Sequence, residues 1–534
     1  MASADTAFGV FTENGPWVVD LDDLAWKVDL AGARADLHAS LPALIRRRRL
    51  PPGKRVGTTV RHVGGALGLW YLTERRRGGT ERMAGISRRL RIAAERLGPT
   101  YIKLGQIVAS GEGIFPPELV AEFKRCRDQV PPEPWPVIEA VIRQELGRPP
   151  SEVFASIDHD PLAAASIAQV HRAHLADGTE VVIKVQRPSV LQRVRQDLAV
   201  MAWLAPFLVG RIPIAALANP PALVELFAET IVEELDFRLE AENMLDIART
   251  FAELGQRDFV VPRPHPTLVT RRMLVMERLR GFNFSDVDGM RAAGIDTEAV
   301  VRSGMIGFLE GAMMHGIFHG DLHAGNLFIL PTGKIALLDF GITARLSEPK
   351  RLALLSLVVG ASNGDIASQV AALRDLGALP AHINVDVVMD RLGLDRPPVD
   401  PTTLTPEELV AELQRSIKTL LSLGARMPKE LMLYVKNLVF LDGAIASLAP
   451  DLDLFGEIEA ISLMFAEKHG ERIVQQLGLQ RQEDWKPNLS SMKASFGLDD
   501  TTERLTHREI QARRKQIRQK FDGRRASGRR RTRQ

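Results

Sequence analysis

Hydrophobic and polar positions follow a helical period in the first patterned part of the chain. This period runs from about residue 81 to residue 127, with interruptions at "LGPTYIKLGQ" and "SGEGIFPPEL". The segment "VPPEPWP" (130–136) is interpreted as a linker, because prolines push the residues before them out of the helical conformation. A further helix is expected after it, ending at Gly147. Residues 1–80 are only weakly patterned.

The pattern then changes to strands. "SIAQVHRAHL" and "TEVVIKVQ" are β-branched runs joined by "ADG", which predicts a hairpin. A long amphipathic helix is expected over residues 221–254, and "TLVTRRMLVMERLRG" predicts a second strand pair that ends in a turn at Gly281. The apolar stripe of the long helix is formed by Val224, Phe227, Ile231 and Leu235.

From residue 296 to about residue 480 the pattern is mostly helical. Strands first and helices afterwards, with Gly281 between them, predict two lobes. The expected organisation is an amino-terminal region of unclear role, a helical extension, a β-rich lobe, a helical lobe and a basic tail. Their expected bounds are 1–80, 81–150, 151–281, 282–480 and 481–534.

Composition favours a soluble or peripheral protein. Apolar residues make up 45% of the chain and charged residues 25%, as in ordinary globular proteins. The apolar run at 198–210 is interrupted by Pro206 and is shorter than the ~20 residues that a bilayer requires. Cys126 is the only cysteine, which fits a reducing compartment. With no visible signal peptide or membrane span, we expect a cytoplasmic location, at most peripheral to the inner face of a membrane.

Charge is distributed unevenly. Residues 504–534 contain thirteen Lys or Arg against Glu509 and Asp522, whereas the whole chain has a net charge of only +3. The body is therefore acidic and the tail basic. Such a tail is typical of a disordered, solvated extension, and it also suits an anionic membrane surface. Because it has only one aromatic residue, Phe521, we expect no specific nucleic-acid binding.

Five residues form a pattern suited to phosphate chemistry. Asp321 and Asn326 in "HGDLHAGN" supply a carboxylate and an amide oxygen, and Asp339 in "LLDFG" supplies a second carboxylate after a strand. Magnesium prefers such oxygen ligands. Lys184 lies on the second hairpin strand, and Glu240 falls on the following helix, where it is expected to pair with Lys184. Asp321 is the candidate catalytic base, while Asn326 and Asp339 are the candidate metal ligands.

The order and spacing of these residues are those of protein kinases. Each motif alone is a weak signal, but the five together predict an α+β, two-lobed kinase-like fold that uses ATP and Mg²⁺. The segment "HGDLHAGN" is also similar to that of the aminoglycoside and choline kinases, which act on small molecules. The choice among these families depends on the rest of the chain.

The glycine-rich loop that normally covers the phosphates is missing. In its place stands "PLAAASIAQV", whose alanines carry Cβ atoms and make the turn stiffer. We expect nucleotide to sit differently beneath this loop, with poor transfer to a bulky acceptor. The candidate nucleotide-binding residues, besides Lys184, are Ala163, Ala164, Ala165, Ser166, Met276 and Glu277.

These motifs, taken together, resemble the UbiB-type (AarF-like) atypical kinases, whose members support isoprenoid quinone metabolism. The resemblance rests on "KLGQ", "DQVPP", "AAASIAQVH", "VVIKVQRP", "EELDFRLEAEN", "FHGDLHAGNLF" and "LLDFG", and it covers about residues 90–450. It implies ATPase activity rather than efficient protein phosphorylation. The absence of an A-P-E motif after "DFGITARLSEPKR" agrees with that reading.

The resemblance also assigns regulatory residues. In that family the K-x-G-Q segment is a helix over the active site, so Lys103 and Gln106 would occlude the protein-substrate groove. Glu234 and Asp236 of the "ELD" motif would engage this segment. Two functions follow: an ATP- and Mg²⁺-dependent enzyme acting on a lipid or quinone pathway, or a nucleotide-gated pseudokinase scaffold for a partner in that pathway. An aminoglycoside-type phosphotransferase explains neither "KLGQ" nor "AAAS".

Overall fold

A computed structural model of the chain places its residues in two compact units. The residues it describes are 8–46, 50–76, 79–109, 115–126, 131–208, 220–395, 408, 415–416, 419–420, 422–480, 485–495, 498–499 and 501–515. The first unit comprises the chain up to Glu253 together with Phe259–Gly281 and Ala336–Thr343. The second comprises Leu254–Asp258, Phe282–Ile335 and the chain from Ala344 onward. The chain therefore enters the second unit briefly at Leu254–Asp258 and again after Gly281, and the short segment around Asp339 returns to the first.

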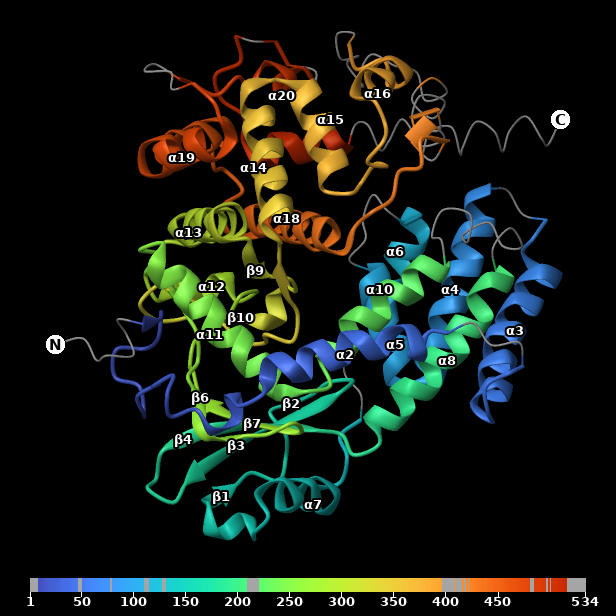
Figure 1. Ribbon diagram of the computed structural model, residues 1–534, viewed down its shortest axis with the longest axis vertical. Helices are drawn as coiled ribbons and strands as arrows, with labels where there is room; N and C mark the ends of the chain where they lie inside the picture. Colours follow the sequence, from blue (N-terminus) through green and yellow to red (C-terminus); the bar gives the residue numbers. More distant parts are fainter. Residues whose placement is uncertain are drawn as a thin grey trace. The chain divides into compact units, whose positions relative to one another are not determined.

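The first unit begins with a helical region (Figure 1). Helices α3, α4, α5 and α6 each pack against the next one in the chain. Helices α8 and α10 pack against each other, α8 also packs on α2 and α3, and α10 also packs on α2. Gly98, at φ +101°, separates α4 from α5 in the left-handed region that glycine tolerates. The whole "KLGQ" motif is therefore helical. The helices are α2 (Leu30–Leu44), α3 (Arg55–Thr73), α4 (Gly79–Leu97), α5 (Pro99–Ala109), α6 (Pro117–Phe123), α7 (Trp135–Leu146), α8 (Val190–Leu208), α10 (Pro220–Glu233) and α11 (Phe237–Glu253), with single 3₁₀ turns at Ala25–Lys27 and Pro150–Glu152.

The described residues of the first unit also form a six-stranded sheet in the order β1-β3-β4-β7-β6, with β2 paired to β3. Both predicted strand pairs are confirmed, and the β3–β4 ladder sets Val170 opposite Lys184. On the other side of β4, Lys184 lies opposite Leu274 of β7. The six strands of this sheet are β1 (Phe154–Ile157), β2 (Ala163–Ala164), β3 (Ala168–Leu175), β4 (Glu180–Gln186), β6 (Pro264–Val269) and β7 (Met273–Glu277), and the short strand β5 (Phe259–Val260) lies outside it.

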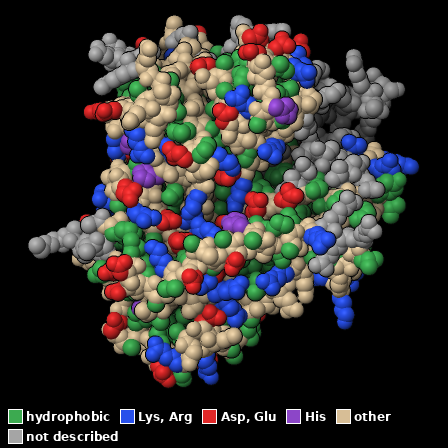
Figure 2. Space-filling view, in the orientation of Figure 1, with side chains coloured by type: hydrophobic (Ala, Val, Ile, Leu, Met, Phe, Trp, Pro, Cys, Tyr) green, Lys and Arg blue, Asp and Glu red, His purple; other side chains and the backbone are tan. Residues whose placement is uncertain are grey.

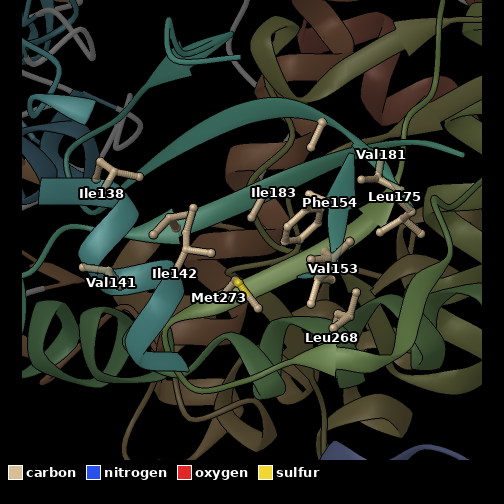
Figure 3. Close-up of a cluster of buried hydrophobic side chains, with 13 residues drawn as sticks. Ile138, Val141, Ile142, Val153, Phe154, Leu175, Val181, Ile183, Leu268 and Met273 are labelled. Carbon is tan, nitrogen blue, oxygen red and sulfur yellow. The ribbon is translucent and has the colours of Figure 1, made fainter. Parts of the chain in front are cut away.

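One face of this sheet forms a hydrophobic core with helix α7 (Figure 3). Strand side chains alternate between the two faces of a sheet. On β4 the residues Val181, Ile183 and Val185 therefore enter this core, where all three are fully buried. Lys184 lies between Ile183 and Val185 and belongs to the opposite face. The buried residues that α7 contributes are Ile138, Val141 and Ile142.

The single helix predicted over residues 221–254 is wrong, because the structure has two helices. The break falls at "ELD", between Glu233 and Phe237. Asp236 begins the second helix by accepting a hydrogen bond from the Arg238 N–H at 3.1 Å. The carbonyl of Leu235 accepts one from Gln186 Nε2 at 3.1 Å, so it leaves the helical ladder. An Asp before a helix commonly caps it, and here that local bond overrides the apolar period.

The second unit is mainly helical, as the pattern from residue 296 predicts (Figure 1). Helix α13 packs on α18, while α14 packs on α15 and α19. The helices are α12 (Val287–Ala292), α13 (Thr297–Glu310), a π-helical turn (Gly311–His315), a 3₁₀ turn (Ala324–Asn326), α14 (Glu348–Asn363), α15 (Ile366–Asp375), α16 (Val385–Leu392), α18 (Lys429–Leu448), α19 (Leu454–Leu477) and α20 (Ser490–Ser495). The short strands within this unit are β8 (Phe282–Asn283), β9 (Ile317–His319) and β10 (Leu327–Ile329), while β11 (Ile335–Leu337) and β12 (Thr343–Arg345) each include residues assigned to both units.

Helix α18 is long and apolar enough to cross a membrane, which the sequence analysis did not anticipate. Within the described residues it is one such helix, with a mean hydropathy of 1.5 over its best window. Half of that window is buried inside the protein. A core helix of a soluble protein has the same properties, so length and composition alone are weak grounds for a span.

Part of the expected basic tail is packed. Leu505 and Ile510 are buried against Phe455 of α19. The guanidinium of Arg514 forms an ion pair with Asp442 at 2.7 Å. The packed body thus extends beyond residue 481, and the rest of the tail, 516–534, lies outside the described residues. Figure 2 shows basic and acidic side chains interspersed over the visible face, in keeping with 69 Lys or Arg and 66 Asp or Glu.

Candidate functional site

Three of the predicted residues meet in the first unit. The Lys184 ammonium donates to Glu240 Oε1 at 2.6 Å and to Asp339 Oδ2 at 3.0 Å. Lys184 reaches them from β4, Glu240 from the first turn of α11, and Asp339 from the segment after β11. The ring of Phe237 lies 5.4 Å from the same ammonium. The structure therefore forms the predicted strand-lysine and helix-glutamate pair, and it adds Asp339 as a second partner.

The charges in this cluster are strongly coupled. Burial raises the pKa of Glu240 to about 7, although Lys184 opposes this shift. Desolvation would also raise the pKa of Asp339, but the Lys184 and Lys103 cations and the Gly341 N–H lower it to about 2. Burial lowers the pKa of Lys184, yet the two carboxylates more than reverse that effect. Lys184 and Asp339 are therefore both charged at neutral pH, and Glu240 titrates near it.

Backbone and side-chain bonds fix the "DFG" segment beside the lysine. The Gly341 N–H donates to Asp339 Oδ1 at 2.9 Å, and the Phe340 N–H donates to Glu240 Oε1 at 3.3 Å. Asn243 Nδ2 donates to the Phe340 carbonyl at 2.7 Å. Sequence reasoning did not single out Asn243. Its position one turn after Glu240 in "EELDFRLEAEN" was the available signal, because residues three apart share a helical face.

The "KLGQ" and "ELD" motifs also meet. Lys103 of α5 forms an ion pair with Glu234 at 2.9 Å, and both side chains are largely buried. A Cβ atom added to Gly341 would lie 3.3 Å from Glu234 and 3.1 Å from Asp339, so this pair borders the "DFG" segment directly. Gln106 lies one turn along α5. The Asp236 carboxylate instead pairs with the Arg238 guanidinium at 2.7 Å.

The alanine-rich loop is tightly held. Ala163 and Ala164 form β2, which pairs with β3, and the Ala165 N–H donates to the Ala168 carbonyl at 2.9 Å. Ser166 is buried. The Ala165 carbonyl accepts a hydrogen bond from Arg187 Nε at 3.0 Å.

Arg187, which sequence reasoning missed, connects the loop to the linker before α7. It is only 5% exposed, and its guanidinium reaches Glu133 at 3.1 Å and the Pro131 carbonyl at 3.0 Å. Its place in "VVIKVQRP", directly after β4, was the signal.

Met276 and Glu277 lie at the end of β7, and both are buried. The Glu277 carboxylate accepts hydrogen bonds from the Arg263 backbone N–H at 3.2 Å and from the Arg263 guanidinium at 3.3 Å. Its other oxygen contacts the hydroxyl of Thr12. The side chain of Glu277 is thus engaged by Arg263 and Thr12, and its backbone N–H donates to the Arg263 carbonyl at 2.9 Å.

Asp321 and Asn326 lie together in the second unit. Asn326 Nδ2 donates to the Asp321 carbonyl at 3.1 Å, and the Asp321 N–H donates to His319 Nδ1 at 3.1 Å. The ammonium of Lys436, on α18, contacts Asp321 Oδ1. Sequence reasoning did not identify Lys436, which lies more than a hundred residues further along the chain.

Asp339 in the first unit and Asn326 in the second each carry an oxygen atom of the kind that magnesium prefers. Asp339 keeps 45% of its side chain exposed, so its carboxylate remains accessible. Asn326 donates through its amide nitrogen, so its side-chain oxygen is the atom chemically suited to a cation. Among the described residues, no group of three or more His, Cys, Asp or Glu could hold a metal ion. Magnesium commonly takes only one or two carboxylates and completes its shell with phosphates and water.

A lysine–glutamate pair between strand and helix, a "DFG" carboxylate beside it and a two-unit fold define a kinase-like protein. The model of the ABC1 atypical kinase-like domain matches residues 125–373. An uncharacterized protein of Mycobacterium tuberculosis (strain H37Rv) is 34% identical over 364 residues, covering 66% of this chain and 73% of the relative. An uncharacterized aarF domain-containing protein kinase from the Arabidopsis thaliana chloroplast is 32% identical over 394 residues, covering 68% and 72%.

The probable protein kinase UbiB of Aliivibrio fischeri (strain MJ11) is 31% identical over 376 residues, covering 69% of each chain. A solved Mycobacterium tuberculosis protein in complex with erythromycin aligns at 22% identity with a TM-score of 0.37, covering 65% of this chain and 91% of that one. The chain belongs to the ABC1 atypical kinase-like family, as its relatives above 30% identity establish. The resemblance to the UbiB and AarF proteins is thereby confirmed.

Proposed function

We propose that this protein is an ATP-binding, Mg²⁺-dependent atypical kinase or ATPase of the UbiB type. It acts on, or regulates, isoprenoid quinone or lipid metabolism and does not phosphorylate proteins efficiently. The observation that carries the proposal is the Lys184–Glu240–Asp339 cluster, in which each residue has the charge and contact that nucleotide chemistry needs. The quinone or lipid pathway rests on the relationship to proteins named UbiB.

Each residue has a distinct role. Lys184 holds the α- and β-phosphates, and Glu240 orients its ammonium. Asp321 accepts the proton of the attacking hydroxyl or water. Asn326 and Asp339 would hold Mg²⁺, which supplies charge neutralisation on the phosphates when it is bound. Ala163–Ala164 and the residues after them cover the phosphates, while Met276 and Glu277 border the base.

The role of Glu240 predicts a pH dependence. Only the ionised carboxylate pairs with the ammonium, and burial raises the pKa of Glu240 to about 7. Turnover should therefore fall as the pH drops below about 7, because Glu240 gains a proton. A pH–rate profile of the wild-type protein checks this. The residual turnover of Glu240→Gln should show no such decrease at low pH. If this variant showed the same decrease as the wild type, another group would be responsible for it.

A second candidate function is a nucleotide-gated scaffold. The Lys103–Glu234 ion pair borders the "DFG" segment, and an alanine-rich loop replaces the glycine-rich one. Both features favour binding over turnover. In this case MgATP would bind and change the affinity for a lipid or quinone-pathway partner. Membrane association would be peripheral, with the basic tail on an anionic surface of the cytoplasmic leaflet.

The deciding experiment is ATP hydrolysis by the purified full-length protein. We expect turnover that disappears with EDTA, returns with Mg²⁺ and falls about 100-fold in Asp339→Asn, because the carboxylate ligand is lost. The assay is repeated with phosphatidylglycerol and with phosphatidylcholine vesicles, and stimulation by the former alone would support the lipid surface. MgATP binding without turnover in either condition would reject the enzyme and favour the scaffold.

A further inference from the structure

Helix α18 carries two adjacent polar residues in the middle of an apolar sequence. In "LMLYVKNLVFL" only Lys436 and Asn437 interrupt the hydrophobic run. Polar groups buried in such a helix are costly unless they are paired. Both of these residues are directed at the loop that carries Asp321.

Asn437 holds the backbone of that loop. Its side chain is fully buried, and both of its amide atoms are used. Oδ1 accepts a hydrogen bond from the Leu322 N–H at 3.2 Å, and Nδ2 donates to the His319 carbonyl. The amide thus spans the residues on either side of Gly320 and Asp321, which fixes the loop on α18.

Lys436 holds the side chain of the same loop. Its ammonium contacts Asp321 Oδ1, with 16% of the lysine and 18% of the aspartate side chain exposed. The Asp321 N–H is bonded to His319 and its carbonyl to Asn326. The backbone and the carboxylate of Asp321 are therefore restrained together. A general base requires such restraint because it must accept a proton from a defined direction.

The loop itself supplies no permanent cation. Between Asp321 and Asn326 it reads "LHAG", with His323 as the one titratable residue. A carboxylate that must approach a phosphoryl group meets strong repulsion, since that group carries several negative charges. An opposite charge at contact distance in a partly buried site reduces this repulsion, and Lys436 is placed to provide it.

We propose that Lys436 is a positioning residue for Asp321. Its ammonium orients the carboxylate and offsets its charge against the incoming phosphate. Asn437 fixes the loop, which keeps the Lys436 and Asp321 side chains in contact. This inference rests on the proposed role of Asp321, and it adds a residue that the sequence motifs do not contain.

The test compares Lys436→Met and Lys436→Arg with a matched control, Lys350→Met. Lys350 also forms an ion pair with α18, to Glu430 at 2.9 Å, but away from the loop. We expect Lys436→Met to lower kcat about 10- to 100-fold with unchanged MgATP affinity and melting temperature. Lys436→Arg should recover much of the loss, and Lys350→Met should behave like the wild type.

A double-mutant cycle shows whether Lys436 acts through Asp321. In an Asp321→Asn background, adding Lys436→Met should have no further effect on kcat, because the group it positions is already absent. Charge can be tested separately in Lys436→Cys by alkylation with 2-bromoethylamine, which restores an ammonium. The native Cys126 is buried, and the alkylated wild type controls for its reaction.

The outcomes separate this inference from the proposed function. The inference is supported if Lys436→Met lowers kcat in the wild-type background but not in the Asp321→Asn background, and if alkylation of Lys436→Cys restores kcat. Unchanged kcat, or additive losses in the double variant, would overturn it while leaving the ATPase intact. A parallel loss of melting temperature and MgATP affinity, without rescue, would show a purely structural lysine. A wild-type protein without turnover would overturn both proposals.

Discussion

Replacing Lys184 with methionine is expected to lower Mg²⁺-dependent ATP turnover by about 1000-fold. Methionine keeps a long unbranched side chain between Ile183 and Val185 but removes the cation that holds the phosphates. It also leaves the carboxylates of Glu240 and Asp339 without the ammonium that both contact. Like charges then repel in a partly desolvated place, so nucleotide affinity should fall as well. Steady-state kinetics and MgATP titration measure the two effects.

The control for this change is Arg172→Met. Arg172 is a cation on the neighbouring strand β3, and it pairs with Asp158 at 2.7 Å on an exposed part of the sheet. Surface pairs of this kind contribute about 0–1 kcal/mol, so this variant should retain wild-type turnover. If Lys184→Met retained more than a tenth of the activity, the proposed role of Lys184 would be wrong.

Truncating Phe237 to alanine is expected to lower the free energy of unfolding of the first unit by about 3–5 kcal/mol. Phe237 is 1% exposed at the start of α11, and its N–H donates to the Arg271 carbonyl at 3.0 Å. Its ring also lies beneath the Lys184 ammonium. The change removes core packing and a cation–π contact at once. Denaturant titration followed by tryptophan fluorescence measures the loss.

Phe207→Ala provides the comparison. Phe207 lies on α8 with 47% of its surface exposed, so its removal should cost no more than about 1 kcal/mol. Equal destabilisation by the two changes would show that the packing around Phe237 is not what stabilises the start of α11.

The sequence predicted the parts of the site whose residues lie on regular elements. Lys184 alternates with core residues on a strand, so the strand period placed it. Glu240 was selected by the order of the kinase motifs, on a helix whose start the period did not register. The single helix through Leu235 was wrong because periodicity does not register a cap. Asp236 caps the start of the second helix through a local bond to the Arg238 N–H, which competes with a continuous helical ladder.

The missed residues all act over long sequence separations. Arg187 reaches the linker at Glu133, and Lys436 reaches Asp321 from α18. The hydrophobic pattern around an isolated lysine or asparagine in an apolar run does not indicate which distant residue it will contact. Only the folded chain reveals that these polar side chains are paired.

The return of Ala336–Thr343 to the first unit limits how this protein can be divided. Neither unit is one continuous stretch of sequence. A gene fragment that ends at Gly281 would encode Lys184 and Glu240 but lack Asp339, and the complementary fragment would carry that carboxylate without its lysine. Recombination, split reporters or single-domain expression at this boundary would therefore separate Asp339, the proposed metal ligand, from Lys184, which it contacts.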